Sequence, residues 1–386
     1  ETGVITLSES YGLEVNLSSF IGDLSAGERQ RVEIIRALIQ KPKLLIMDEP
    51  TSVLTPFECE SLFKTLKTLA SEGTSILYIS HKLKEIADLC DTASVLRKGA
   101  IVGEYDPKKM TPRELGEIMV GQSLFEPKRP VATNKSNKVL SVKINEVKPD
   151  TQFGVTLKNI DLAVYQSEIL GIGGVAGNGQ EELMQILTGE KKVRNVSIKY
   201  MGNNVEMLNP RERREIGLAF APEERLGHAA VANLNLLENS LITDPKKRFQ
   251  KKMGFIDFSE LNEYTNEIIE KFNVKTTGVS ALASSLSGGN LQKFVVGREI
   301  GQKPSLFIVN QPTWGVDALS AANIRQAIVD IANTGAAIIL ISQDLDEILE
   351  ISNKVAFLTN GNLSIPTNTM DIKTDEIGAI MGGISD

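Results

Sequence analysis

The chain of 386 residues carries one stretch of sequence twice. Residues 24–57 and residues 286–319 align over 34 positions without a gap, and 12 of these positions hold the same residue. The second stretch begins 262 residues after the first, and the same offset relates His81 to Gln343 farther along. Because one offset holds over both distances, we infer that the chain contains two copies of one domain.

The spacing of apolar residues predicts alternating helices and strands in each copy. Residues 28–40 and 56–70 have helical spacing, whereas residues 44–47 and 75–79 are short apolar runs typical of buried parallel strands. The same order recurs over residues 290–341. Strands that alternate with helices predict an α/β fold with a parallel sheet.

The two copies differ in length. The first has 23 residues before its LSAGE motif, whereas the second has about 145 before its LSGGN motif. We therefore expect roughly 100 to 120 residues of the first copy to be absent from this chain. The predicted division is an incomplete first domain at 1–125, a linker at 126–139 and a second domain at 140–386. The polar stretch 126–150 is interpreted as a solvated tether in preference to a basic patch.

Composition argues against several functional classes. The chain has 42 Lys and Arg against 49 Asp and Glu, a net charge of −7, which disfavours general electrostatic binding to nucleic acid or an anionic membrane. No apolar run approaches the roughly 18 to 20 residues that span a bilayer. Two cysteines, Cys59 and Cys90, argue against a disulfide framework and indicate a reducing compartment. The first residues resemble neither a start nor a signal peptide.

A glycine-rich loop in the second copy has the spacing of a phosphate-binding P-loop. Gly174 and Gly179 match the GxxxxGK[ST] pattern with Gly177 between them, after a predicted strand and before a predicted helix. Gln180 replaces the lysine that reaches the phosphates, and Glu181 replaces the hydroxyl that holds Mg²⁺. The loop alone fits an ordinary turn equally well, but the repeat favours a degenerate P-loop.

An acidic strand end marks the first copy as the one equipped for hydrolysis. Asp48 suits Mg²⁺ coordination, and the carboxylate of Glu49 can polarise an attacking water. His81 follows the next predicted strand and could reach a γ-phosphate. Each residue alone also fits a structural role, but all are lost together in the second copy. The equivalent positions there hold the neutral amides Asn310, Gln311 and Gln343.

Each copy also has a turn of small residues before a predicted helix. These turns let backbone amides and a serine hydroxyl approach a phosphate at the positive end of the helix. Such a turn alone is unspecific, and it becomes specific when a helix and a strand-end acid pair follow about 20 residues farther on, as Asp48 and Glu49 do in the first copy. The residues are Ser25 and Gly27 in the first copy and Ser287, Gly288 and Gly289 in the second.

Together these residues resemble the ATP-binding subunits of ABC transporters, over essentially the whole chain. LSAGERQ and LSGGNLQ are similar to the family's signature motif, LLIMDEP to Walker B, and His81 to the switch histidine. The segment 52–55 is similar to the D-loop, with Thr55 in place of the usual Asp. The fused copies and the DEPTSVLTP segment are similar to the sugar and nucleoside importer branch. The segments GVAGNGQEEL, FAPEERL and NQPTWGVD are closest to its nucleoside-type members.

The resemblance implies a P-loop NTPase fold of two tandem ABC ATPase domains, the first incomplete, in a head-to-tail arrangement. Each ATP would then lie between the P-loop of one copy and the signature of the other, so one site would hydrolyse ATP with Mg²⁺ on Asp48. The hydrolytic site would combine Asp48, Glu49 and His81 with Ser287, Gly288 and Gly289. The degenerate site would combine Gly174, Gly177, Gly179, Gln180 and Glu181 with Ser25 and Gly27.

The resemblance also implies the partners. An ATPase of this kind is peripheral to the cytoplasmic face of the inner membrane, contacts integral-membrane permease subunits and serves an extracytoplasmic substrate-binding protein indirectly, without nucleic acid. The segment 220–226 is expected in the docking region, although a plain surface loop fits it nearly as well. The alternative is a soluble tandem ABC ATPase of translation or DNA repair, a class that usually keeps both sites intact. A non-catalytic scaffold is disfavoured by Asp48, Glu49 and His81. The chain alone is expected to be nearly inactive.

Overall fold

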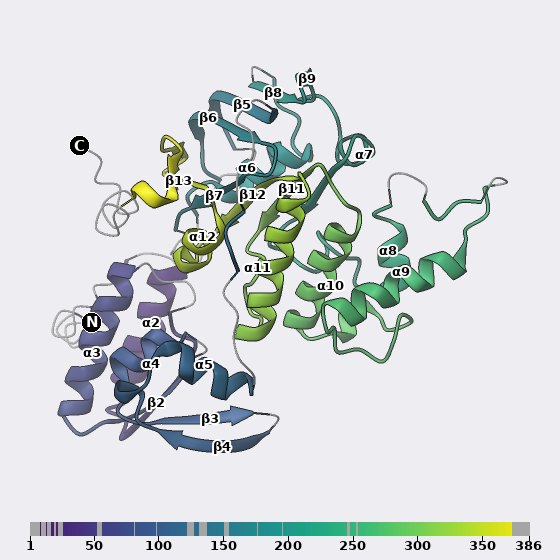
Figure 1. Ribbon diagram of the computed structural model, residues 1–386. Helices are drawn as coiled ribbons and strands as arrows, with labels where there is room; N and C mark the ends of the chain where they lie inside the picture. Colours follow the sequence, from purple (N-terminus) through teal and green to yellow (C-terminus); the bar gives the residue numbers. More distant parts are fainter. Residues whose placement is uncertain are drawn as a thin grey trace. The chain divides into compact units, whose positions relative to one another are not determined.

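The computed structural model describes the greater part of the chain. Two compact units divide it: unit 1, Glu1–Leu124, and unit 2, Phe125–Asp386 (Figure 1). The described residues are 8, 13, 17–18, 21, 26–51, 56–80, 82–97, 99–121, 127–130, 137–149, 154–175, 177–194, 196–244, 248–251 and 254–372.

The described residues of unit 1 form helices and two short pairs of strands. Its elements are α2 (Ala26–Leu38), β1 (Leu44–Asp48), α3 (Pro56–Ser71), β2 (Ser75–Ile79), α4 (Leu83–Leu89), β3 (Ala93–Arg97), β4 (Ala100–Tyr105) and α5 (Pro112–Val120). Strands β1 and β2 are parallel, whereas β3 and β4 are antiparallel. The main apolar core of the described part packs α2 and α3 against one face of the first pair.

Unit 2 alternates strands and helices over most of its length. Its elements are β5 (Lys138–Val147), β6 (Leu157–Tyr165), β7 (Ile169–Gly173), α6 (Gln180–Thr188), β8 (Val196–Tyr200), β9 (Asn203–Asn204), α7 (Pro210–Glu215), β10 (Leu218–Ala221), α8 (Leu236–Leu241), α9 (Phe258–Lys271), α10 (Gly288–Gly301), β11 (Leu306–Asn310), α11 (Ala318–Asn333), β12 (Ala337–Ser342), α12 (Leu345–Ile351), β13 (Lys354–Thr359), β14 (Asn362–Leu363) and β15 (Thr367–Asn368).

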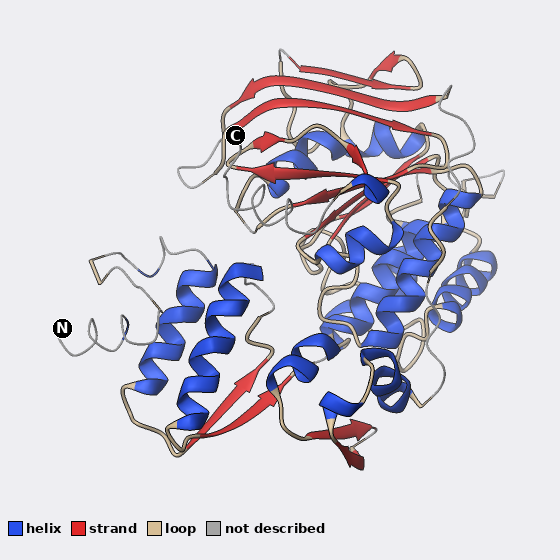
Figure 2. Cartoon of the chain, turned by 60° about the vertical axis from the view of Figure 1, so that its left-hand side comes forward, coloured by secondary structure: helices blue, strands red, loops and turns tan. Residues whose placement is uncertain are grey.

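A mixed sheet runs through unit 2 between two apolar layers (Figure 2). Strands β10, β11, β12, β7 and β13 are parallel neighbours, and antiparallel strands β5, β6, β8 and β9 extend the sheet beyond β14. Helices α8 to α12 cover one face. Helix α6 and the antiparallel strands cover the other face. The parallel α/β fold expected from the sequence is therefore confirmed in this unit.

The 262-residue repeat of the sequence recurs as a repeat of structure. Helices α3 and α11 begin and end at equivalent positions, and so do α4 and α12. The strand pairs β1–β2 and β11–β12 share one register, with Leu44 opposite Ser75 and Leu306 opposite Ala337. The two copies therefore present the ends of these strands on the same local backbone.

Apolar strands and capped helices explain the local structure. Every residue of β11 and of β12 is buried, as expected for strands covered on both faces. Helix α11 begins where the side chain of Asp317 accepts the backbone N–H of Ser320 at 3.0 Å. The chain reverses after this helix at Gly335, whose φ of 110° suits glycine.

The prediction that β1 and β2 are buried on both faces is wrong for unit 1. Leu44 and Ile46 of β1 are 54% and 60% exposed, whereas their counterparts Leu306 and Ile308 in unit 2 are fully buried. Helix α6 and the antiparallel strands cover that face in unit 2. The described part of unit 1 holds no counterpart of these elements, so the same apolar alternation leaves one face bare.

Two further features of the fold bear on the expectations. The polar stretch 126–150 is in part sheet, because strand β5 occupies Lys138–Val147 and pairs with both β6 and β8. Among the helices of the described ranges, none is long and apolar enough to cross a membrane.

Candidate functional site

The candidate site of unit 2 lies where its parallel strands end. Strands β10, β11, β12 and β7 are neighbours in that order, so the residues after them meet at one edge of the sheet. The loop at 174–179 follows β7 and Glu223 follows β10. Gln311 and Gln343 follow β11 and β12.

The loop between β7 and α6 has the backbone of a phosphate-binding loop. Gly177 and Gly179 have φ values of 81° and 108°, which favour glycine. A Cβ at Gly174 would lie 2.6 Å from the carbonyl oxygen of Leu358. Helix α6 begins at Gln180, directly after Gly179, so its first N–H groups face this loop.

Gln180 closes this loop on itself. Its Nε2 donates to the carbonyl oxygen of Val175 at 2.8 Å, and its Oε1 accepts the backbone N–H of Asn178 at 3.1 Å. The side-chain amide of Asn178 donates to the same carbonyl at 2.9 Å. A neutral amide supplies no charge to a phosphate, and here it also occupies one N–H donor of the loop. A nucleotide would have to displace these bonds.

Two carboxylates lie close together at the same edge. Burial raises the pKa of Glu223, the negative charge of Glu181 raises it further, and Arg225 partly offsets both effects. The amide of Asn310 lies 3.5 Å from the carboxylate of Glu223. No group of three His, Cys, Asp or Glu side chains that could hold a metal occurs within the described ranges. The residues at this edge therefore differ from the lysine, hydroxyl and aspartate that hold ATP and Mg²⁺ in an intact P-loop site.

The first copy presents its acids on the backbone that presents amides in the second. Asp48 ends β1 and is exposed. Glu49 has a φ of 43° and its N–H donates to the carbonyl of Ile79 at 2.8 Å. Gln311 has a φ of 53° and makes the equivalent bond to Ile341 at 2.8 Å. The copies thus differ here in side chain and not in backbone.

Some predicted site residues cannot be placed. His81, Ser25 and the segment 52–55 lie outside the described residues. Gly27 lies in the first turn of α2.

The second signature turn is closely packed. Ser287 is the N-cap of α10, and its hydroxyl accepts a hydrogen bond from the side chain of Asn290 at 2.9 Å. A Cβ at Gly288 would lie 2.5 Å from the Arg225 guanidinium, and one at Gly289 would lie 2.8 Å from the carbonyl of Gly315. Gly289 is therefore required, because backbone fills the space of a Cβ, whereas a Cβ at Gly288 would displace the guanidinium of Arg225. The turn places free N–H groups at the start of a helix.

Sequence reasoning does not anticipate the places of Glu223 and Arg225. The segment 220–226 is expected on a docking surface, yet both side chains are only partly exposed and turn toward residues of the site. The available signal is that Ala221 ends an apolar strand, so the next residues join the carboxyl edge of the sheet.

A glutamate ties the strand end to the neighbouring loop in the first copy. The Glu85 carboxylate accepts hydrogen bonds from Thr51 at 2.5 Å, from Tyr78 at 2.7 Å and from Ser80 at 3.3 Å. It also pairs with Lys82 at 3.5 Å. Thr51 lies two residues after Glu49, so this carboxylate links the loop after the acids to the end of β2.

The equivalent Glu347 of the second copy has poorer partners. Ser342 donates to it at 2.7 Å, but Leu340 and Asp344 stand at the positions of Tyr78 and Lys82. Burial and then the charge of Asp344 raise its pKa to about 7, against smaller opposing effects of Ser342, Arg325 and Thr313.

We expect Glu347→Gln to remove a pH dependence of stability. Folding raises the pKa of Glu347 from 4.5 to about 7, so over this window the folded chain holds a proton that the unfolded chain releases. Its contribution is full below pH 4.5 and is lost as the pH rises to 7, at a cost of up to about 3 kcal/mol. Urea unfolding of the chain at several pH values from 5 to 8 measures this slope.

The exposed Glu263 on α9 offers the control, because Glu263→Gln should leave the slope of the unfolding free energy against pH unchanged. An equal slope in Glu347→Gln and in the unaltered chain would contradict the assignment.

The chain matches the family described as ABC transporter over residues 4–52 and 157–314, more than half of its length. The chain belongs to the ABC transporter family. The resemblance expected from the signature, Walker B and P-loop segments is thereby confirmed, together with the P-loop NTPase fold.

Curated members of the ABC family are similar over nearly the whole chain. The nucleoside import ATP-binding protein NupA of Lactococcus lactis subsp. cremoris is 36% identical over 98% of this chain and 75% of its own length. The glucose import ATP-binding protein TsgD13 of Haloferax volcanii is 35% identical over 100% of this chain and 70% of its own. An archaeal ribosome recycling factor, aABCE1, solved with the stalk protein aP1, shares the fold. Its TM-score is 0.70 at 18% identity, covering 100% of this chain and 71% of that one.

Proposed function

We propose that this chain energises an ABC importer for simple sugars or nucleosides, with one hydrolytic and one degenerate ATP site. The observation that carries the proposal is the exchange of acids for amides on one backbone, Asp48-Glu49 in the first copy and Asn310-Gln311 in the second. The import functions named for NupA and TsgD13 support the transport role.

In the proposed hydrolytic site, each residue has one task. Mg²⁺ held by Asp48 would neutralise charge on the phosphates. Glu49 would accept the proton of the attacking water, and His81 would contact the γ-phosphate, as the resemblance to the switch histidine implies. The signature turn at Ser287 to Gly289 supplies N–H groups and a hydroxyl to the same phosphate.

The proposed degenerate site binds nucleotide weakly or only holds the two copies together. Gln180 is bonded to its own loop, and Glu181 and Glu223 add negative charge where a triphosphate needs cations. Asn310 and Gln311 replace the Walker B acid and the proposed base, so a bound nucleotide would persist unhydrolysed there.

The partners we propose are integral-membrane permease subunits, contacted from the cytoplasmic face. Of the segment 220–226, Leu226 is exposed, and so are Val231 and Leu282 of the neighbouring loops, which are linked by backbone pairing. These apolar side chains provide a surface that a cytoplasmic permease loop can cover.

The test is transport by the complete protein. Co-expressed with its permease and reconstituted into vesicles, it should drive ATP-dependent uptake of either a labelled hexose or pentose or a labelled nucleoside. Failure of all three uptakes, together with ATPase activity stimulated by ribosomes, would refute the importer and favour the translation alternative.

A further inference from the structure

Arg225 joins three segments at the carboxyl edge of the sheet in unit 2. Its Nε donates to the side-chain oxygen of Gln292 on α10 at 2.9 Å. Its Nη2 donates to the backbone carbonyl of Trp314, and the guanidinium lies over the Trp314 ring, 4.9 Å from the centroid. These contacts, together with the approach to Gly288, are called the Arg225 clamp.

Glycines make room for this clamp on both sides. A Cβ at Gly288 would lie 2.5 Å from Nη1 of Arg225, and a Cβ at Gly315 would lie 3.2 Å from Nη2. Gly288 is the first residue of α10 and belongs to the signature turn. The guanidinium therefore lies between the signature turn and the loop that follows β11.

The clamp extends to the position of the acid pair. Gln292, which accepts from Arg225, donates through its Nε2 to the carbonyl of Gln311 at 3.1 Å. Gln292 is 1% exposed, so its amide is held by both bonds in a dry setting. Gln311, Gln292 and Arg225 thus form one chain of hydrogen bonds from the end of β11 to the signature turn.

The guanidinium of Arg225 is suited to holding several groups at once. It presents several N–H groups in a planar fork and stacks on an aromatic ring at the same time, which a lysine cannot do. Burial lowers the pKa of Arg225, and the charge of Glu223 two residues earlier raises it again. An arginine guanidinium stays charged in proteins, so its hydrogen bonds are charge-assisted.

We propose that Arg225 is a positioning residue, which holds the signature turn Ser287–Gly289 against the loop 311–315. The inference rests on the proposed function, in which this turn binds the phosphate of the hydrolysed ATP. Loss of the clamp lets the turn move, and small displacements of a phosphate-binding group lower turnover strongly.

Trp314 is the only tryptophan of the chain, so its fluorescence reports on the clamp without any ATPase activity. In Arg225→Ala we expect emission shifted to longer wavelength and stronger quenching by acrylamide than in the unaltered chain. Arg225→Lys keeps the charge but not the fork, and its emission should also change. Arg211→Ala is the matched control, because the exposed side chain of Arg211 pairs with Glu215 on the surface of α7.

ATP turnover by the complete protein then tests the positioning role. Arg225→Ala is expected to lower kcat about 10- to 100-fold at an unchanged melting temperature, with Arg225→Lys intermediate and Arg211→Ala unaffected. Altered Trp314 emission with full turnover would overturn the proposal and leave the proposed function intact. Unaltered emission in both variants would overturn it as well. An unaltered complete protein without ATPase activity would instead refute the proposed function, while the fluorescence result still decides whether the clamp exists.

Discussion

Replacing Glu49 with glutamine is expected to reduce kcat for ATP hydrolysis by the complete protein by about 10²- to 10⁴-fold. A glutamine at this position keeps the shape of the side chain but cannot accept the proton of the attacking water. The second copy already carries Gln311 on an equivalent backbone, with a φ of 53° and the same hydrogen bond to the next strand. The variant should therefore fold normally, and its loss of turnover reports on chemistry.

The converse exchange provides the control. Gln311→Glu restores a carboxylate in the second copy. A hydrolytic site also needs a lysine, a hydroxyl and an aspartate that binds Mg²⁺, and these positions are still occupied by Gln180, Glu181 and Asn310. We expect no gain in kcat from Gln311→Glu alone and no rescue when it is combined with Glu49→Gln. Turnover at the unaltered rate in Glu49→Gln would show that the hydrolytic base lies elsewhere.

The elements of the repeat could be predicted closely from the sequence. The expected strands at 44–47 and 75–79 are found as Leu44–Asp48 and Ser75–Ile79, because short apolar runs between helical segments leave little choice of element. The offset then carried each prediction into the second copy. The glycines of the P-loop were also predicted, since their spacing reflects a backbone that few other residues adopt.

The sequence pattern does not predict which strand faces are covered by other elements or which way the site side chains point. Leu44 and Leu306 have the same local pattern, yet one is exposed and the other buried, because the covering helix α6 comes from a distant part of the chain. The inward turn of Gln180 depends on where the loop places the carbonyl of Val175. The position of Arg225 depends on three loops that only the folded sheet brings together.

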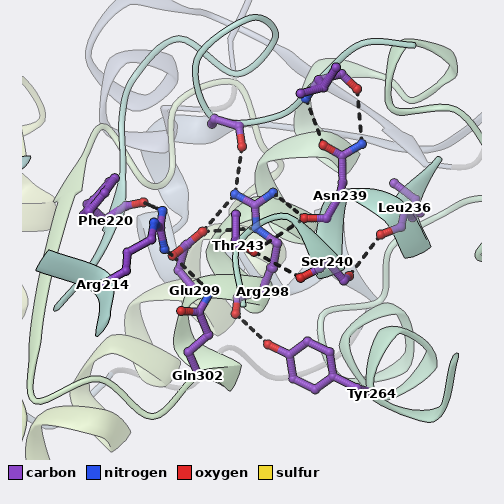
Figure 3. Close-up of polar contacts among 12 residues, drawn as sticks. Arg214, Phe220, Leu236, Asn239, Ser240, Thr243, Tyr264, Arg298, Glu299 and Gln302 are labelled. Carbon is purple, nitrogen blue, oxygen red and sulfur yellow. Dashed lines mark hydrogen bonds and ion pairs between the residues drawn. The ribbon is translucent and has the colours of Figure 1, made fainter. Parts of the chain in front are cut away.

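A buried ion cluster fastens α10 to the helices beside it (Figure 3). Glu299 is 0% exposed and accepts from both Arg298, at 2.8 Å, and Arg214. Arg298 is 1% exposed and also donates to the carbonyls of Ala229 at 2.7 Å and of Asn239 at 3.2 Å. Burial lowers the pKa of Arg298, and the charge of Glu299 opposes this effect.

Glu299→Ala is expected to lower the free energy of unfolding of the chain by about 3 to 5 kcal/mol, because it leaves the buried cation of Arg298 without its anion. In unit 1 the counterpart of Glu299 is Ala37, and the counterpart of Arg298 is Arg36. The side chain of Arg36 is 72% exposed and therefore needs no buried anion. Urea unfolding measures the loss. Glu215→Ala removes the exposed partner of Arg211 and should cost less than about 1 kcal/mol.

The cluster and the signature turn lie on one helix, so the same variant separates stability from function. Arg298 lies about three turns beyond Gly288 on α10 and donates to the carbonyls of Ala229 and Asn239. The segment at Ala229 meets residues 224–225 through backbone hydrogen bonds, whereas the clamp is made by the side chain of Arg225. Because the cluster and the clamp share no side-chain hydrogen bond, we expect kcat to stay within about threefold of the unaltered complete protein under conditions where Glu299→Ala remains folded. If Glu299→Ala were as stable to urea as Glu215→Ala, the buried cation of Arg298 would not need the carboxylate of Glu299. A destabilised but folded variant with greatly reduced kcat would mean that the whole of α10, and not its first turn alone, sets the geometry of the signature.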